Sequence, residues 1–312
     1  MLDKLDFKLL AELMKNSRAP VTILAKKLKA SREVTTYRMN KLVKEGIILH
    51  FITEINIQKL GYVGAAVFVD IRATREKEFR TYLEKNHSVS WVAELSGVWS
   101  YGLSIYGKNN EEIDNKFLEL YTRFKEDIID HRITFHKQSH FFYGKYFNEI
   151  PIITKEKITT GKIDKIDKKI LQALSTNARL DYVELSKRIS LTAPAIAQRI
   201  KQLEKQGIIQ KYSIFIDLMK LGIFQYSIFI VNKKISDQSK LLAYLSEYPQ
   251  VSFIAEYIGE QFLEFGLFVK NPYELRTHLQ KIEESFPDNR VIEISLFHHE
   301  FVSVGPPSCV FD

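Results

Sequence analysis

Two short segments of the 312-residue sequence place polar side chains at a spacing suited to hydrogen bonding with nucleic acid. Each begins with a hydroxyl residue, Ser31 or Thr192, that can cap the first free N–H groups of a helix. An apolar stripe at spacing i, i+4 and i+7 then turns the intervening side chains outward. Side chains in the first turns can reach base edges, and Arg or Lys further along can meet phosphates or brace the helix. We predict DNA contacts from Ser31, Arg32, Glu33, Thr36, Tyr37, Arg38, Asn40, Lys41, Thr192, Ala193, Pro194, Ala197, Gln198, Arg199, Lys201 and Gln202.

The basic charge of the chain is confined to the two segments around these helices. Residues 1–50 hold 11 Lys and Arg against 5 acidic residues, a net charge of +6, and residues 161–211 hold the same numbers. Because the whole chain carries only +7, the remainder carries a net charge of −5. A localised surplus favours a surface that neutralises phosphates, whereas a uniform excess would indicate only a charged, soluble surface.

Each basic segment has the apolar pattern of three helices, of which the polar helix above is the third. Gly46 and Gly207 end that third helix, where a left-handed residue is least strained. Two helices, a short turn and a third helix with a polar first half form a helix-turn-helix (HTH), whose last helix enters the major groove. A three-helix bundle for protein contacts is the alternative. The inward residues of the second helices are expected to be Ile23, Leu24 and Leu28, and Val183, Leu185 and Ile189.

The whole pattern occurs twice. Leu2–Leu10 returns as Ile163–Leu171, and the match continues at this constant offset through Gly61, which matches Gly222. It resumes with the offset increased by one from Val89, which matches Val251, and continues through Phe135-His136, which matches Phe297-His298. A repeat this long indicates a duplicated module of several domains, so that one chain holds what is usually two subunits. Because the outward residues of the two third helices differ, two DNA half-sites of different sequence are expected.

Beyond each basic segment the pattern becomes strand-like. Strands are expected at 63–71, 89–95, 101–106 and 128–136, with helices after the first and third. The order β-α-β-β-α-β is that of a ferredoxin-like unit, which leaves one sheet face uncovered. We expect the two sheets to pair within the chain, because the short connector (144–161) gives them a high effective concentration. The expected contact residues are Val67, Val69, Ile71, Ile228 and Ile230.

The predicted class is α+β, with two HTH domains and two ferredoxin-like domains. Cys309 is the only cysteine, which excludes a disulfide framework or a cysteine metal cage, and no apolar run is long enough to span a bilayer. We therefore expect a cytoplasmic protein without membrane contact. The predicted segments are HTH domains 1–50 and 162–211, strand linkers 51–61 and 212–222, ferredoxin-like domains 62–143 and 223–304, connector 144–161 and tail 305–312.

Several ordered motifs give the two halves a family likeness. They are Leu-Asp-x-x-Asp-x-x-Ile/Leu-Leu from Leu2 and Ile163, Leu-x-Lys in the second helix, Arg-x-x-x-Leu-x-x-x-Gly-Ile-Ile from Arg38 and Arg199, and the Leu-Gly before each sheet domain. Each half resembles the leucine-responsive regulator/AsnC (Lrp/AsnC) family of transcription factors. The resemblance implies DNA-binding regulators whose sheet domains dimerise face to face, assemble further and often sense amino acids.

The loops that resemble the family's effector-binding loop depart from its Gly-Asp-Tyr-Asp pattern. They read Gly97-Val98-Trp99-Ser100-Tyr101 and Gly259-Glu260-Gln261-Phe262-Leu263. Both acidic positions are lost in the first loop, and the second of them is replaced by Phe262 in the other loop. Because a buried ammonium group needs a charged partner, an amino-acid effector is doubtful, while another ligand or none is left open. The candidate effector-binding residues are Gly97, Trp99, Ser100, Gly259, Gln261 and Phe262.

An enzyme with the same architecture is the main alternative, because the siroheme decarboxylases, which act on a tetrapyrrole, resemble this arrangement. The resemblance places their His and Arg near the second strand, but residues 91–100 and 253–262 contain neither. No catalytic triad order, phosphate-binding glycine loop or metal-ligand spacing is visible, so no catalytic residue, metal site or cofactor is predicted. The expected partner is double-stranded DNA. Non-specific architectural DNA binding and a higher homo-oligomer are left open.

Overall fold

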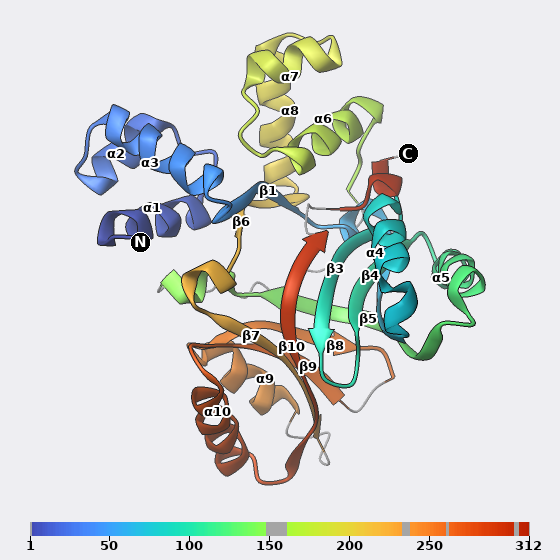
Figure 1. Cartoon of the computed structure of the whole chain (residues 1–312). Coiled ribbons are helices and arrows are strands. Elements are labelled where there is room, and N and C mark those ends of the chain that lie inside the picture. Colours follow the sequence, from blue (N-terminus) through green and yellow to red (C-terminus); the bar gives the residue numbers. More distant parts are fainter. Residues whose placement is uncertain (1, 148–160, 233–237, 260–261, 303–305, 312) are drawn as a thin grey trace. The chain divides into compact units, whose positions relative to one another are not determined.

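The chain forms two compact units, each of which draws on both halves of the sequence. The computed structural model describes residues 2–147, 161–232, 238–259, 262–302 and 306–311. The first unit, here called the helical unit, comprises residues 1–62, 155–217 and 303–312. The second, called the barrel unit, comprises residues 63–154 and 218–302 (Figure 1). Most of the predicted connector, residues 148–160, lies outside the described residues.

The helical unit contains two three-helix domains, as predicted. Asp3 and Asp164 begin the first helices with reciprocal capping boxes. Ser31 Oγ accepts a hydrogen bond from the Val34 amide, and Thr192 Oγ1 accepts one from the Ala195 amide, which confirms the predicted starts of the third helices. The helices are α1 (Lys4–Lys15), α2 (Val21–Leu28) and α3 (Arg32–Lys44), and α6 (Lys165–Thr176), α7 (Tyr182–Ile189) and α8 (Ala193–Lys205).

The predicted inward face of the second helices is partly wrong. Ile23 is 48% exposed and Val183 is 54% exposed, whereas Leu24, Ala25 and Leu28 face the first core. In α7 it is Leu185 that is fully buried. Each of these helices covers little more than two turns, so an apolar pattern of this length does not fix which flank of the helix is buried.

A two-stranded ribbon joins the two HTH domains. Strands β1 (Ile48–Ile55) and β6 (Ile209–Ile216), which begin slightly before the predicted linkers, pair antiparallel. Thr53 Oγ1 donates a hydrogen bond to the Leu174 carbonyl at 2.8 Å, and Ser213 Oγ donates one to the Met14 carbonyl at 3.0 Å. Each strand therefore packs against the first helix of the other half. The helical unit also includes the short 3-10 helices η1 (Gln58–Leu60) and η6 (Ser308–Phe311).

The barrel unit has the predicted ferredoxin-like order in both halves. The strands form one closed barrel in the order β10-β3-β4-β2-β5-β8-β9-β7. The first half supplies β2 (Val63–Ile71), α4 (Glu76–Lys85), β3 (Val89–Ser96), β4 (Tyr101–Gly107), α5 (Asn110–Phe124) and β5 (Ile128–Phe141). The second half supplies β7 (Phe224–Asn232), α9 (Gln238–Glu247), β8 (Val251–Tyr257), β9 (Phe262–Val269), α10 (Pro272–Ser285) and β10 (Asn289–Val302), and short 3-10 helices are η2 (Ala73–Arg75), η3 (Tyr143–Phe147) and η4 (Met219–Leu221).

Two equivalent seams join the halves of the barrel. β5 pairs with β8, and β10 pairs with β3, so each last strand hydrogen-bonds to the other half. This pairing explains why β5 continues to Phe141, opposite Phe253, although the sequence pattern ends it at His136. Only the contact with the other half stabilises the additional residues as a strand.

The predicted contact face between the sheets is wrong by one position along each strand. Val67, Val69 and Ile71 pack under α4 and α5 in the core of the first half, and Ile228 and Ile230 pack under α9 and α10. The side chains that meet inside the barrel instead include Ala66, Phe68, Phe229, Phe253 and Phe297. β2 is apolar on both faces, so alternation along the strand does not show which face meets the partner sheet.

The repeat offset changes twice along the barrel unit. β2 begins at Val63 and β7 at Phe224, whereas α4 and α9 begin at Glu76 and Gln238, which are farther apart by one position. In the last strands the offset returns to its first value, because Phe135 pairs with Ala65 and Leu296 pairs with Tyr226. The expected match of Phe135-His136 with Phe297-His298 is therefore out of register by one position.

Candidate nucleic-acid interface

The third helix of the first HTH domain presents an exposed polar and aromatic face. Arg32, Glu33 and Asn40 are exposed, and Tyr37 is 69% exposed. Because Thr36 lies between them on the helix, these side chains form one surface. Together with Pro20, Val21 and Thr22 at the start of α2 they line a shallow hollow. The hollow joins the N-terminal parts of the two helices that a helix-turn-helix presents to DNA.

The third helix of the second HTH domain presents a smoother face. Pro194 and Gln198 are exposed, while Ala193 and Ala197 are partly buried. The Thr192 hydroxyl caps the helix, and Ala and Pro side chains offer no hydrogen-bonding group. Gln198 therefore supplies the side-chain amide of the first turns that can pair with a base edge. The hollow beside α8 lies on another flank, toward the start of α6, and is lined by Lys162, Asp164, Asp167, Ala195, Gln198, Arg199 and Gln202 among others.

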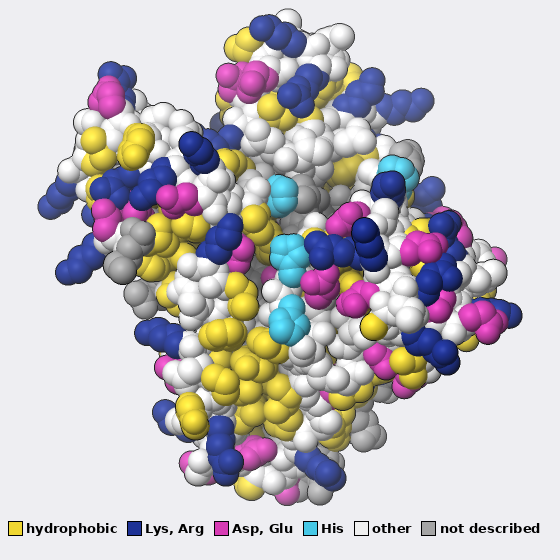
Figure 2. All heavy atoms as spheres, in the orientation of Figure 1, with side chains coloured by type: hydrophobic (Ala, Val, Ile, Leu, Met, Phe, Trp, Pro, Cys, Tyr) yellow, Lys and Arg dark blue, Asp and Glu magenta, His cyan; other side chains and the backbone are white. Residues whose placement is uncertain are grey.

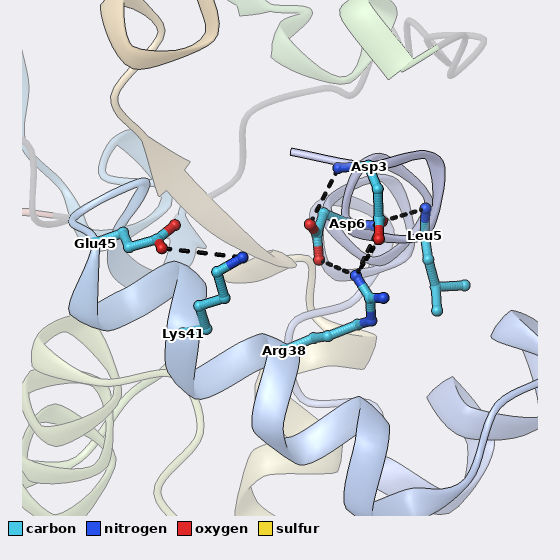
Figure 3. Close-up of polar contacts among 6 residues, drawn as sticks. All are labelled: Asp3, Leu5, Asp6, Arg38, Lys41 and Glu45. Carbon is cyan, nitrogen blue, oxygen red and sulfur yellow. Dashed lines mark hydrogen bonds and ion pairs between the residues drawn. The ribbon is translucent and has the colours of Figure 1, made fainter. Parts of the chain in front are cut away.

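Arg38 and Arg199, predicted either to meet phosphate or to brace the helix, are placed to brace it. Arg38 Nη1 lies 2.7 Å from Asp6 Oδ1 and 2.8 Å from Asp3 Oδ2, which ties α3 to the start of α1 (Figure 3). The Asp6 amide and the Arg38 guanidinium lower the pKa of Asp3. Arg199 makes the same contacts with Asp164 and Asp167, at 2.8 Å each. The equivalent bridges fix the tilt of each third helix on its domain.

Arg38→Ala should loosen α3 from α1 and lower the thermal unfolding midpoint of the helical unit by about 5 °C, because the buried Asp6 carboxylate loses its charged partner. Hydrogen exchange of the α1 and α3 amides locates the change. Lys41→Ala is the matched control, since Lys41 Nζ lies 3.9 Å from Glu45 on the exposed surface (Figure 3). Equal protection in both variants would show that the bridge does not hold these helices together.

Basic side chains gather around both third helices. Lys41 is partly exposed and Lys201 is exposed, both toward the C-terminal half of their helix. Figure 2 shows Lys and Arg side chains over the helices of both HTH domains. The exposed lysines of the first domain include Lys26, Lys27, Lys29 and Lys44. This distribution creates a positive surface suited to the phosphate backbone of DNA.

Two arginines each donate hydrogen bonds from one HTH domain to the other. The sequence pattern alone assigns them no role. Arg18 Nη1 donates to the carbonyls of Ala178 and Leu180, at 2.6 and 2.8 Å. Arg179 Nη1 donates in return to the carbonyls of Ser17 and Ala19. Burial, and then the nearby Arg18 charge, lowers the pKa of Arg179. We call this reciprocal contact the arginine clasp. The offset that relates Leu2 to Ile163 also relates Arg18 to Arg179, and this recurrence is the signal for the clasp in the sequence.

The described residues of the candidate effector loops make contacts within the barrel unit. Trp99 is 6% exposed, and its Nε1 donates to Glu293 Oε1 at 2.6 Å. Ser100 Oγ donates to Asp70 Oδ1 at 2.6 Å. Gly97 and Gly259 adopt positive φ angles, and Phe262 packs against Phe229. Gln261 lies outside the described residues.

Two further observations concern metal ions and membranes in the described part of the chain. No three His, Cys, Asp or Glu side chains gather there as metal ligands. No helix there is long and apolar enough to cross a bilayer.

Comparison with known proteins identifies the two helix-turn-helix domains. A family model described as winged helix-turn-helix DNA-binding matches residues 2–48 and 163–210. The uncharacterized HTH-type transcriptional regulator PH0061 of Pyrococcus horikoshii is 36% identical over 99 residues, which cover 31% of this chain and 66% of that protein. The HTH-type transcriptional regulator LrpC of Bacillus subtilis is 33% identical over 98 residues, 31% of this chain and 68% of LrpC. Each alignment thus spans about two thirds of the regulator.

Both halves together resemble the fold of a solved enzyme structure. The crystal structure of the siroheme decarboxylase NirDL aligns with 97% of this chain and 94% of its own chain, with a TM-score of 0.63. The sequences are 14% identical, so the likeness shows a common fold and does not indicate a common activity.

Proposed function

The chain belongs to the Lrp/AsnC family of HTH-type transcriptional regulators, and we propose that it regulates transcription by binding double-stranded DNA with both HTH domains of one chain. The observation that carries this proposal is the helical unit, in which one β ribbon and the arginine clasp join two basic HTH domains. A family dimer would bring two HTH domains together by association. Here the covalent chain supplies both, so DNA affinity should not depend on dimerisation of separate subunits.

Phosphate contacts are proposed for the basic residues that do not brace the third helices. Replacing Lys41 and Lys201 together by Ala should reduce the slope of log affinity against log salt by about 2, or about 1 per lost phosphate contact. The measurement is a titration of one duplex at several salt concentrations. Lys85→Ala, an exposed lysine at the end of α4 in the barrel unit, is the matched control. An unchanged slope in the Lys41 and Lys201 variant would remove these residues from the interface.

A regulator without enzymatic activity is the function we propose over the decarboxylase alternative. NirDL shares the fold of this chain but only 14% of its sequence, whereas the proteins of similar sequence, at 36% and 33% identity, are named as transcriptional regulators. β3 and β8, the strands before the candidate effector loops, contain no His and no Arg. We also propose that the first of these loops holds no amino acid, because Trp99 and Ser100 already donate to carboxylates of the protein.

A further inference from the structure

A buried ion pair links the two halves inside the barrel unit. Arg132 on β5 donates from Nη1 to Glu293 Oε2 at 2.8 Å and from Nη2 to Oε1 at 3.0 Å. The Glu293 side chain on β10 is 7% exposed and that of Arg132 is 24% exposed. Two parallel bonds of this kind are the strongest arrangement of a guanidinium and a carboxylate.

Arg132 and Glu293 occupy the same position in the two copies of the fold. Arg132 lies opposite Phe68 in the β2–β5 pair, and Glu293 lies opposite Phe229 in the β7–β10 pair. The offset from Arg132 to Glu293 equals the offset from Phe68 to Phe229, which is also that from Leu2 to Ile163. The rings of Phe68 and Phe229 also touch, with centroids 5.3 Å apart. The pseudo-two-fold axis that relates the two sheets therefore passes between the two charged side chains.

Residues on such an axis meet their own equivalents. If two copies of the first half paired in this way, Arg132 would face a second Arg132, and two copies of the second half would bring together two Glu293 carboxylates. Like charges in a buried site are strongly unfavourable, whereas opposite charges with two hydrogen bonds are tolerated. We propose that Arg132 and Glu293 make each sheet domain select the other half of the chain and reject a second copy of itself.

The surroundings of the pair sharpen this selection. The Arg132 guanidinium lies over the rings of Phe229, Phe68 and Trp99, with centroid distances of 4.4, 5.0 and 5.1 Å. Trp99 Nε1 also donates to Glu293, so the carboxylate accepts three hydrogen bonds. The aromatic rings cover much of the guanidinium and the Glu293 side chain is only 7% exposed, so an unpaired charge at this position is unfavourable.

A second carboxylate near the pair does not replace Glu293. Glu264 on β9 is buried and accepts hydrogen bonds from Ser227 at 2.5 Å and from Tyr257. Burial raises the pKa of Glu264, and the neighbouring Glu293 charge acts in the same direction. Glu264 is thus bound by neutral donors of its own half, and Glu293 is the carboxylate that Arg132 contacts with two hydrogen bonds.

The first test exchanges the charges within one chain. Glu293→Arg and Arg132→Glu should each lower the thermal unfolding midpoint of the barrel unit by about 10 °C, because each leaves like charges on the axis. The double variant, with Glu at 132 and Arg at 293, should recover at least half of that loss. Arg276→Glu, an exposed charge reversal on α10, is the control for net charge. A double variant as unstable as the sum of the single changes would overturn the proposal.

The second test asks whether the charges choose the partner. Chains with Glu293→Arg carry Arg at both axis positions, 132 and 293, and chains with Arg132→Glu carry Glu at both. Co-expressed with different affinity tags, these two variants should copurify several-fold more than two differently tagged wild-type chains. Pairing between the two chains restores opposite charges at both axis positions, so variants that fold poorly alone can still be tested. Copurification at the wild-type level would show that the pair does not select between halves. Neither test involves DNA, so the outcome does not depend on the proposed function.

Discussion

A selection from random double-stranded DNA should return sites with two half-sites of different sequence. The reason lies in the two third helices, which share a fold but not their outward residues. α3 offers Arg32 and Tyr37 with strong hydrogen-bonding or stacking groups, whereas the equivalent face of α8 offers Pro194 and Gln198. A homodimer with identical helices reads a palindrome, and this chain has no such constraint. Recovery of perfect palindromes would contradict the assignment.

Variants of one helix should then affect one half-site alone. Arg32→Ala combined with Tyr37→Ala should weaken binding to the selected site by roughly 10- to 100-fold, and should relax base preference in a single half-site. Gln198→Ala should relax the other half-site. Electrophoretic titration on duplexes mutated in either half-site separates the two effects. If both variants relax the same bases, the helices have been assigned to the wrong half-sites.

The same selection distinguishes specific regulation from architectural binding. Base readout adds roughly 4 to 10 kcal/mol to the phosphate contribution, so a specific regulator yields a consensus at fixed salt. A protein that contacts only phosphates yields none. On α8, Ala193 and Ala197 carry no hydrogen-bonding group. We therefore expect a weaker consensus in the half-site that this helix reads.

The helix boundaries of the HTH domains could be predicted from sequence because their signals are local. Ser31, Thr192, Gly46 and Gly207 act through hydrogen bonds or backbone angles within a few residues. The role of Arg38 could not be resolved in the same way. Phosphate contact and bracing require the same residue type, and the Asp6 partner lies on another helix, far from Arg38 in the sequence.

The packing of the barrel unit could not be predicted in the same way, because the contacts that determine it join the two halves. β2 is buried on both faces, so the sequence pattern gave its strand bounds correctly but not its orientation. The recurrence of Phe135-His136 as Phe297-His298 concealed the true register of the last strands. With that register, Arg132 and Glu293 would have been recognised as equivalent positions of opposite charge.

The arginine clasp should restrict tight DNA binding to one distance between the half-sites. Arg18 and Arg179 each hold backbone carbonyls of the other HTH domain, and β1 and β6 pair beside them. The rings of Tyr182 and Tyr212 lie 5.4 and 5.2 Å from the Arg18 guanidinium. Because these contacts fix α3 relative to α8, we expect binding to one spacing of the half-sites and little tolerance of others.

Five additional base pairs between the half-sites turn one of them to the opposite face of the duplex, because a helical turn is about 10 base pairs. Wild-type affinity should then fall by roughly 100-fold or more, toward that of a single half-site. Replacing Arg18 and Arg179 together by Ala should lower affinity for the original site and reduce the difference between the two spacings to roughly 10-fold, because the domains can reorient. Arg188→Ala, which removes an exposed charge from α7 outside the clasp, should retain the wild-type ratio. A clasp variant that discriminates between the spacings as strongly as the wild type would leave the β ribbon alone to set the distance.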